Sequence, residues 1–274
     1  MLEILKSIIF GIVEGITEWL PISSTGHLIL LNEFMPLNVS KEFWEMFEVV
    51  IQLGAILAVV LIFWHKIFPF KKERGHVRTD MNIINLWFKI VFACVPAAVV
   101  GLLFDDKINA LFYNPTTVGI ALIVFGIAFI LIENRNRGMK PRVRRLGDIT
   151  YSTALIIGVF QLIAAVFPGT SRSGATIVGA LLIGVSRTVA AEFTFFLAIP
   201  VMFGASLLKV VKLGFVYTPI EYGILAVGMV TAFIVSVLVI RFLMAYIKKH
   251  DFKAFGWYRI VLGLIVLLYF GLIK

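Results

Sequence analysis

Six long apolar runs constrain this chain more than any other feature of its sequence. Each is close to the ~20 residues that a helix needs to cross a hydrocarbon layer about 30 Å thick. The runs occupy residues 47–64, 84–104, 116–132, 193–208, 220–240 and 260–273. Hydrophobic residues fill 60% of the 274 positions and charged residues only 15%, whereas soluble domains hold roughly a quarter charged residues. The sequence therefore predicts an all-α, polytopic membrane protein.

The basic residues lie in the connections between the apolar runs. Three connections are rich in Lys and Arg: the one after the first run, the linker at 135–145 and the one before the last run. Because basic loops stay in the cytoplasm, this alternation places these three connections on the cytoplasmic side. The net charge of +9 does not predict a nucleic-acid partner, since the basic residues neither share one face nor alternate with exposed aromatic residues.

The two halves of the chain resemble each other. The segment "FGIVEGITEWLPISSTGH" at 10–27 aligns with "IGVFQLIAAVFPGTSRSGA" at 157–175, with one inserted residue before the serines. The alignment places Gly11 opposite Gly158, Glu14 opposite Gln161 and Pro21 opposite Pro168. Since apolar segments often match by chance, the polar, glycine and proline positions carry the comparison.

A short helical run follows the polar segment of each half, at about 24–34 and 173–183. Eleven helical residues reach roughly 16 Å, about half of the hydrocarbon layer. Each half is therefore predicted to begin with a re-entrant hairpin that breaks at mid-membrane, followed by three crossings. An odd number of crossings per half gives the halves inverted orientations, so that the two polar tips meet near the midplane.

These features predict one integral membrane domain, 1–274, made of two inverted repeats. The predicted bounds are 1–133 for the first repeat with its hairpin at 1–36, 149–274 for the second with its hairpin at 149–186, and 134–148 for a basic cytoplasmic linker. Irregular polar backbone is tolerated at membrane depth only where protein or a watery cavity surrounds it. A polar ligand is therefore expected between the tips.

The second tip, "PGTSRSGAT" at 168–176, is typical of an anion site. Arg172 offers a planar fork of donors suited to phosphate or carboxylate oxygens, and the nearby glycines allow backbone N–H groups to approach closely. The other candidate substrate-binding residues of this tip are Gly169, Ser171, Ser173, Gly174 and Thr176. The alternative is that Arg172 pairs with a buried glutamate and only holds helices together.

The first tip carries carboxylates and a histidine. Glu14 and Glu18 are four residues apart and share a helical face, where a divalent cation, Mg²⁺ or Ca²⁺, would relieve their repulsion. Alternatively, one glutamate pairs with Arg172 and the other is protonated. His27 could activate Ser24, attack phosphorus itself or protonate a leaving oxygen. The remaining candidate substrate-binding residues are Ser23, Thr25, Gly26 and, on the first crossing, Gln52.

The chain resembles the integral-membrane undecaprenyl-diphosphate phosphatases of bacteria, the bacitracin-resistance type. The resemblance covers essentially the whole chain. It rests on "EGITEWLPISSTGH" at 14–27, "FEVVIQLGAILAV" at 47–59 and "PGTSRSGAT" at 168–176. No motif position departs from the family pattern.

This resemblance implies hydrolysis of undecaprenyl diphosphate to undecaprenyl phosphate and inorganic phosphate, which recycles the lipid carrier of cell-wall synthesis and gives bacitracin resistance. It also implies dependence on a divalent cation, an inner-membrane location and a site that faces the periplasm. Carried over to this chain, the catalytic residues are Glu14, Glu18, Ser24, His27 and Arg172. We expect Ser24 to attack with His27 as base, while attack by His27 or water stays open.

A transporter of lipid phosphates or other anions is the main alternative. Broken helices that meet at the midplane of an inverted repeat are a transporter architecture. A phosphatase releases inorganic phosphate in detergent, where no second compartment exists, whereas a transporter only binds its ligand. The sequence leaves open whether the protein forms a homodimer.

Overall fold

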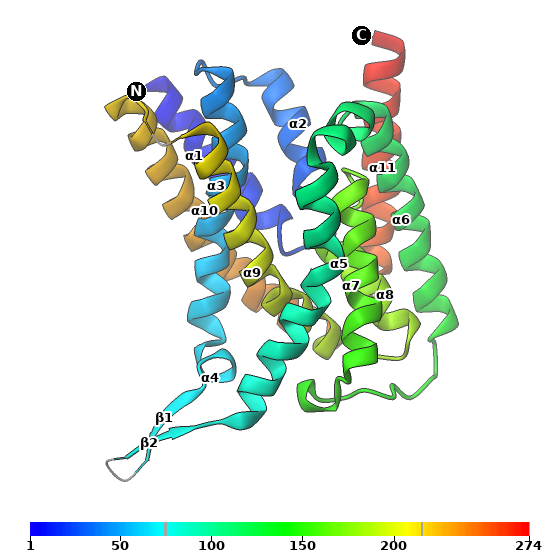
Figure 1. Cartoon of the computed structure of the whole chain (residues 1–274). Helices are drawn as coiled ribbons and strands as arrows, with labels where there is room; N and C mark the ends of the chain where they lie inside the picture. The colour runs from blue at the N-terminus through cyan, green and yellow to red at the C-terminus, as the bar shows by residue number, and fades with distance from the viewer. Residues whose placement is uncertain (74–75, 215, 274) are drawn as a thin grey trace.

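The protein is a bundle of helices with one small β-hairpin at its end (Figure 1). The computed structural model describes residues 1–73, 76–214 and 216–273, without the side chains of 71–73, 105, 109, 272 and 273. Six described helices contain spans long and apolar enough to cross a membrane, which confirms the predicted class and agrees with the six predicted spans. They are α3 (Lys41–Ile62), α5 (Met81–Phe112), α6 (Pro115–Arg135), α9 (Arg187–Leu213), α10 (Pro219–Tyr246) and α11 (Lys253–Leu268).

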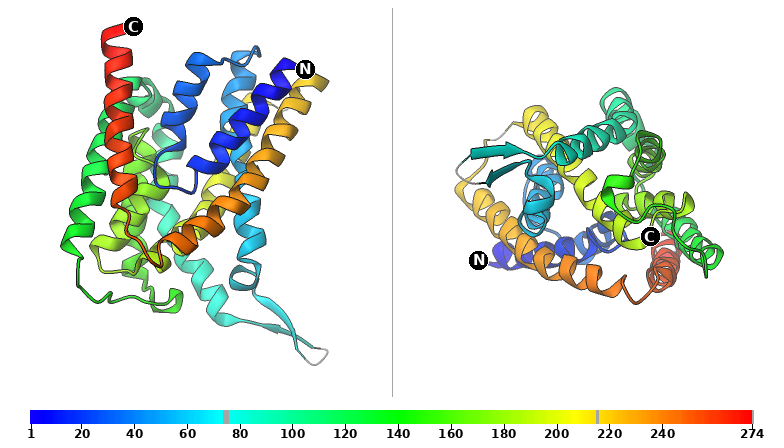
Figure 2. Two further views of the ribbon diagram at one scale, coloured as in Figure 1. Left: turned by 180° about the vertical axis from the view of Figure 1, so that it is seen from behind. Right: turned by 90° about the horizontal axis from the view of Figure 1, so that it is seen from below.

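Two broken helical hairpins precede these crossings, one in each half. The first consists of α1 (Leu2–Thr17) and α2 (Ser24–Phe34), and the second of α7 (Tyr151–Val166) and α8 (Arg172–Leu182). The corresponding helices have equal lengths of 16 and 11 residues. The first hairpin opens toward the end of the bundle that carries both termini, and the second opens toward the opposite end (Figures 1 and 2). The short helices were predicted to within a residue.

Each break contains a proline and ends at a serine in an unusual conformation. The residue before a proline is disfavoured in helical conformation, and α7 ends at Val166, just before Phe167 and Pro168. Ser23 and Ser171 then adopt φ of 74° and 66°, the only positive values of non-glycine residues in the described chain. Both serines are N-caps whose Oγ accepts a backbone N–H three residues on, at 3.4 and 3.1 Å.

The two breaks are thus locally equivalent, at the positions where the sequence alignment pairs them. The relation of the complete halves by inversion stays a prediction, as do the exact repeat boundaries.

The basic connections gather at one end of the bundle (Figures 1 and 2). After α3 the chain forms α4 (Trp64–Ile67) and an antiparallel hairpin of β1 (Phe70–Glu73) and β2 (His76–Thr79). The linker contains the 3₁₀ turn η1 (Leu146–Asp148), and the chain ends in a π-helical turn, η2 (Tyr269–Ile273). The sequence did not predict the β-hairpin, because β2 is exposed along its whole length and has no apolar alternation.

Close helix packing brings the hairpins into the middle of the bundle. A side chain at Gly11 of α1 would collide with the backbone of Gly228 on α10, and one at Gly158 of α7 would collide with the backbone of Ala93 on α5. The first break is anchored by Trp19, which is fully buried and meets Phe195 of α9 edge to face, with ring centroids 5.2 Å apart. These contacts hold both hairpins inside the bundle.

Candidate active site

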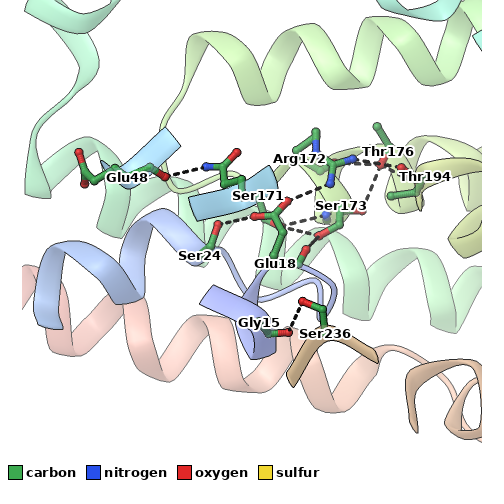
Figure 3. A network of polar contacts seen from close by, with 12 residues as sticks. Gly15, Glu18, Ser24, Glu48, Ser171, Arg172, Ser173, Thr176, Thr194 and Ser236 are labelled. Carbon is green, nitrogen blue, oxygen red and sulfur yellow. Dashed lines mark hydrogen bonds and ion pairs between the residues drawn. The ribbon is translucent and has the colours of Figure 1, made fainter. Parts of the chain in front are cut away.

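The tips of the two hairpins contact each other directly. Arg172, the first residue of α8, donates from Nη2 to Oε1 of Glu18, the C-cap of α1, at 2.9 Å (Figure 3). Ser173 Oγ donates to the backbone carbonyl of Glu18 at 3.1 Å. Residues 154 positions apart in sequence therefore form one polar cluster, as the predicted meeting of the tips requires.

Ser24 belongs to the same cluster. Its Oγ donates to Oε2 of Glu18 at 2.7 Å, so that one carboxylate binds the serine through one oxygen and Arg172 through the other (Figure 3). Ser24 is the first residue of α2, where the helix dipole adds a partial positive charge. Because α8 also begins in the cluster, the first residues of two helices, Ser24 and Arg172, meet at the Glu18 carboxylate.

A cavity of about 150 Å³ opens beside this cluster. Its apolar wall comes from the end of α7 and the middle of α9, at Ala164, Val201, Met202 and Ala205. Its polar lining is Glu18, Ser24, Thr25, Gln52, Ser171 and Arg172, with Gly169 at the break. A site with polar groups on one side and apolar residues on the other suits the polar end of a lipid.

The arginine is held in place from behind. Its Nη1 donates to the carbonyl of Thr194 at 3.1 Å, while Nε is buried without a hydrogen-bond partner. Thr176 bonds the Thr194 hydroxyl at 2.8 Å and donates to the Arg172 carbonyl at 2.9 Å. Thr176, Ser173 and Gly174 do not line the cavity in the structure, and their role in substrate binding stays a prediction. Each is almost fully buried.

His27 lies outside the cavity lining and makes no hydrogen bond to Ser24. Its Nδ1 is 2.7 Å from the Ser23 carbonyl, so Nδ1 carries the proton, and Nε2 accepts a 2.7 Å bond from the Tyr258 hydroxyl. The expected Ser24–His27 pair is thus not formed. The Ser23 carbonyl, one helical turn before His27, accepts the hydrogen bond from the His27 ring, whereas the Ser24 hydroxyl bonds Glu18.

Comparison with known proteins identifies the family. A sequence model described as "Bacitracin resistance protein BacA" matches residues 7–265. The chain belongs to this family. A curated relative from Desulfitobacterium hafniense is 68% identical over 99% of this chain and 97% of its own length. Another from Clostridium acetobutylicum is 66% identical over 98% of each chain, and one from Enterococcus faecalis is 60% identical over 97% of each.

All three relatives are named undecaprenyl-diphosphatase, the second with the suffix 1. These names agree with the resemblance found in the motifs and give no support to the transporter alternative. For a BacA-family phosphatase, the Glu18, Ser24 and Arg172 cluster is the natural candidate for the reacting centre.

Arg259 of α11 is a site residue that the sequence analysis missed. It is fully buried and donates to the carbonyl of Pro21 at 3.1 Å, in the first break. It also donates to the carbonyls of Gly169 at 3.1 Å and Thr170 at 2.7 Å, in the second break. One guanidinium therefore ties both breaks together. A charged residue beside an apolar run could have indicated Arg259 as a functional residue. It was missed because the predicted sixth span began at residue 260, which left Arg259 in the preceding connection.

Glu14 and Glu18 are the residues that would hold the divalent cation that the family resemblance implies. Among the described residues, no group of three or more His, Cys, Asp or Glu side chains is arranged to hold a metal. Glu14 is nevertheless fully buried, both of its oxygens lack hydrogen-bond partners, and it lies within electrostatic range of Glu18. Two carboxylates plus phosphate oxygens and waters match the ligand preference of Mg²⁺, so the residues present fit such an ion.

Proposed function

We infer that the protein removes the terminal phosphate from undecaprenyl diphosphate and releases undecaprenyl phosphate. The observation that carries this conclusion is the tip-to-tip cluster, in which Ser24 and Arg172, from different halves, share the Glu18 carboxylate beside a half-apolar cavity. In a BacA-family chain this cluster has the parts that phosphoryl transfer needs: a hydroxyl nucleophile, a proton acceptor and an arginine fork.

Substrate binding is proposed to exchange partners within the cluster. The terminal phosphate takes Arg172 from Glu18, because a bidentate contact with phosphate satisfies more of the guanidinium donors than one carboxylate oxygen does. The Nε–H of Arg172 is buried and unpaired, and it is proposed to join this contact when the guanidinium turns away from Glu18. Glu18 then keeps its bond to Ser24 and serves as the acceptor of the hydroxyl proton.

The proposed first step is an in-line attack of Ser24 Oγ on the terminal phosphorus. The hydroxyl proton passes to Glu18 over the existing 2.7 Å hydrogen bond as the bond from phosphorus to the bridging oxygen breaks. That oxygen leaves with its electron pair as part of undecaprenyl phosphate. Glu18 then releases this proton to solvent water. A water molecule attacks the phosphoserine and passes a proton to Glu18, the bond from phosphorus to Ser24 Oγ breaks, and Glu18 returns the proton to that oxygen as inorganic phosphate is released.

Glu14 and Glu18 are proposed to hold a divalent cation, Mg²⁺ or Ca²⁺. Such an ion would neutralise charge that develops on the phosphate oxygens. Burial of Glu14 without a hydrogen-bond donor supports this assignment, since an unpaired carboxylate is costly in a low-dielectric core. His27 is proposed to act on the site through the Ser23 carbonyl, as a positioning residue.

The site is proposed to face the periplasm of the bacterial inner membrane. The hairpin that carries Glu18 and Ser24 opens at the end opposite the basic connections (Figure 2), and basic connections favour the cytoplasmic side.

Phosphate release from a short prenyl diphosphate in detergent tests the activity itself. We expect release by the purified protein and its loss after exhaustive chelation, restored by added Mg²⁺ or Ca²⁺. Full activity in chelator would remove the cation from the proposal, while stoichiometric binding without any phosphate release would refute the hydrolase assignment.

A further inference from the structure

A second polar pocket lies at the end of the bundle that carries the basic connections. Its volume is about 250 Å³, and it is formed by α4, the residue that precedes α5, the first turns of α5, and η1. Its polar lining is His65, Lys66, Asp80, Asn82, Asn85 and Lys89. None of these residues lines the catalytic cavity, so the pocket is a separate site.

Lys89 is the unusual member of this lining. Only 8% of the residue is exposed, yet no hydrogen bond or ion pair is formed by it with the side chains and backbone that the structure describes. Lys66, in contrast, is paired with Glu192 at 2.7 Å. The aliphatic stem of Lys89 is buried, but its Nζ is not among the buried polar atoms that lack a partner, so the ammonium reaches the pocket. Lys89 is therefore a cation that is open to a counter-ion from outside the protein.

The geometry of α5 directs Lys89 toward the basic end of the bundle. Helical side chains lean toward the N-terminus of their helix, and α5 begins at this end, at Met81. One turn before Lys89, Asn85 accepts the Tyr151 hydroxyl through Oδ1 at 3.1 Å, which leaves its amide hydrogens as donors. Asp80 is the single carboxylate in the lining and already accepts the backbone N–H of Asn82 at 3.1 Å.

Aromatic residues place the pocket at the membrane–water interface. Trp64 and Tyr151 are 44% and 46% exposed, and Trp87 donates from its indole to the Ile67 carbonyl at 2.7 Å. Trp and Tyr gather where headgroups meet hydrocarbon. Phe88, next to Lys89, is 64% exposed on α5 and gives an acyl chain an apolar surface beside the pocket.

We propose that this pocket binds the phosphate of an anionic phospholipid headgroup. Lys89 forms the ion pair with the phosphate and the Asn85 amide donates a hydrogen bond to it. The volume accommodates a phosphate with a small polar substituent, while the acyl chains lie outside along α5. Basic pockets between membrane helices on the cytoplasmic side recognise lipid phosphates in this way.

Native mass spectrometry of the purified protein with added phosphatidylglycerol tests the proposal. We expect wild type to retain one phosphatidylglycerol in preference to phosphatidylcholine, and Lys89→Met to retain it about tenfold less, the effect of losing one hydrogen bond to a charged group. Lys89→Arg keeps the charge and should retain the lipid. Lys107→Met is the matched control, because it removes an exposed lysine from the other end of the same helix.

Equal retention by wild type and Lys89→Met would overturn the proposal. Displacement of the lipid by millimolar inorganic phosphate would also overturn it, because the pocket would then be a site for free phosphate. Phosphate release by Lys89→Met in detergent reports that the variant is folded and is expected to match wild type. That assay depends only on the catalytic cavity, so it separates failure of this inference from failure of the proposed function.

Discussion

The two broken hairpins share one backbone design but carry different chemistry. Both end a 16-residue helix at a break, both restart at a serine cap with positive φ, and both continue as an 11-residue helix. The first tip places Glu18 and Ser24 in the cavity, whereas the second places Arg172 there. Neither tip alone holds a nucleophile, a proton acceptor and a phosphate clamp. A backbone design shared by both tips therefore forms an asymmetric site where the tips meet face to face.

Loss of the arginine from the second tip should have the largest effect. We expect Arg172→Ala to lower kcat/KM for a prenyl diphosphate by about 10³ or more, because phosphoryl transfer relies on an arginine to neutralise the transition state. Arg172→Lys restores the charge but not the fork, and should recover only part of the activity. Arg137→Ala, in the exposed linker, is the control and should resemble wild type.

Replacement of a serine should lower kcat much more in the first tip than in the second. Ser24→Ala removes the proposed nucleophile and should lower kcat by about 10³. Ser171→Ala removes a helix cap and a cavity hydroxyl and should lower kcat by only about tenfold. Steady-state phosphate release measures both. A larger loss for Ser171→Ala than for Ser24→Ala would show that the nucleophile lies in the second tip and not in the first.

Removal of the Glu14 carboxylate should weaken binding of the divalent cation that we propose for the first tip. We expect Glu14→Gln to raise the Mg²⁺ concentration for half-maximal activity at least tenfold, since one of two protein ligands is lost. Glu45→Gln removes a carboxylate that pairs instead with Lys209 at 3.4 Å and is the control. An unchanged Mg²⁺ titration for Glu14→Gln would show that this carboxylate has no part in metal binding.

Loss of Arg259 should lower stability and activity moderately, because its guanidinium contacts both breaks. Arg259→Met leaves the carbonyls of Pro21, Gly169 and Thr170 without their donor, which we expect to cost about 3 kcal/mol of unfolding free energy. Its kcat should fall roughly tenfold through misplacement of the tips. Thermal unfolding and phosphate release measure the two effects, and Arg259→Lys should recover part of each. A loss of stability with unchanged kcat would make Arg259 purely structural.

Much of this fold could be predicted because lipid imposes strict rules on sequence. The six crossings follow from apolar runs, and the two short helices follow from runs too short to cross. The motifs predicted that Glu18, Ser24 and Arg172 lie close together. The sequence also left open that a glutamate pairs with Arg172, and the structure without substrate contains such a pair between Glu18 and Arg172. The cation, the absence of a nucleic-acid partner and a homodimer stay predictions.

Long-range contacts account for what the sequence did not reveal. Spacing alone cannot show that His27 bonds Tyr258, 231 positions away, or that Arg259 reaches both breaks. Thr176 was grouped with the ligand-binding hydroxyls by its motif, but helix α8 turns it toward Thr194. In each case the partner lies on another helix, and helix packing rather than local pattern determines the contact.

A structure with a non-hydrolysable diphosphonate analogue of undecaprenyl diphosphate would test the shared site most directly. We predict that the terminal phosphonate contacts Ser24 Oγ from the first tip and the Arg172 guanidinium from the second, and that Arg172 is no longer paired with Glu18. A phosphonate bound to one tip alone, with the Glu18–Arg172 ion pair intact, would contradict the account.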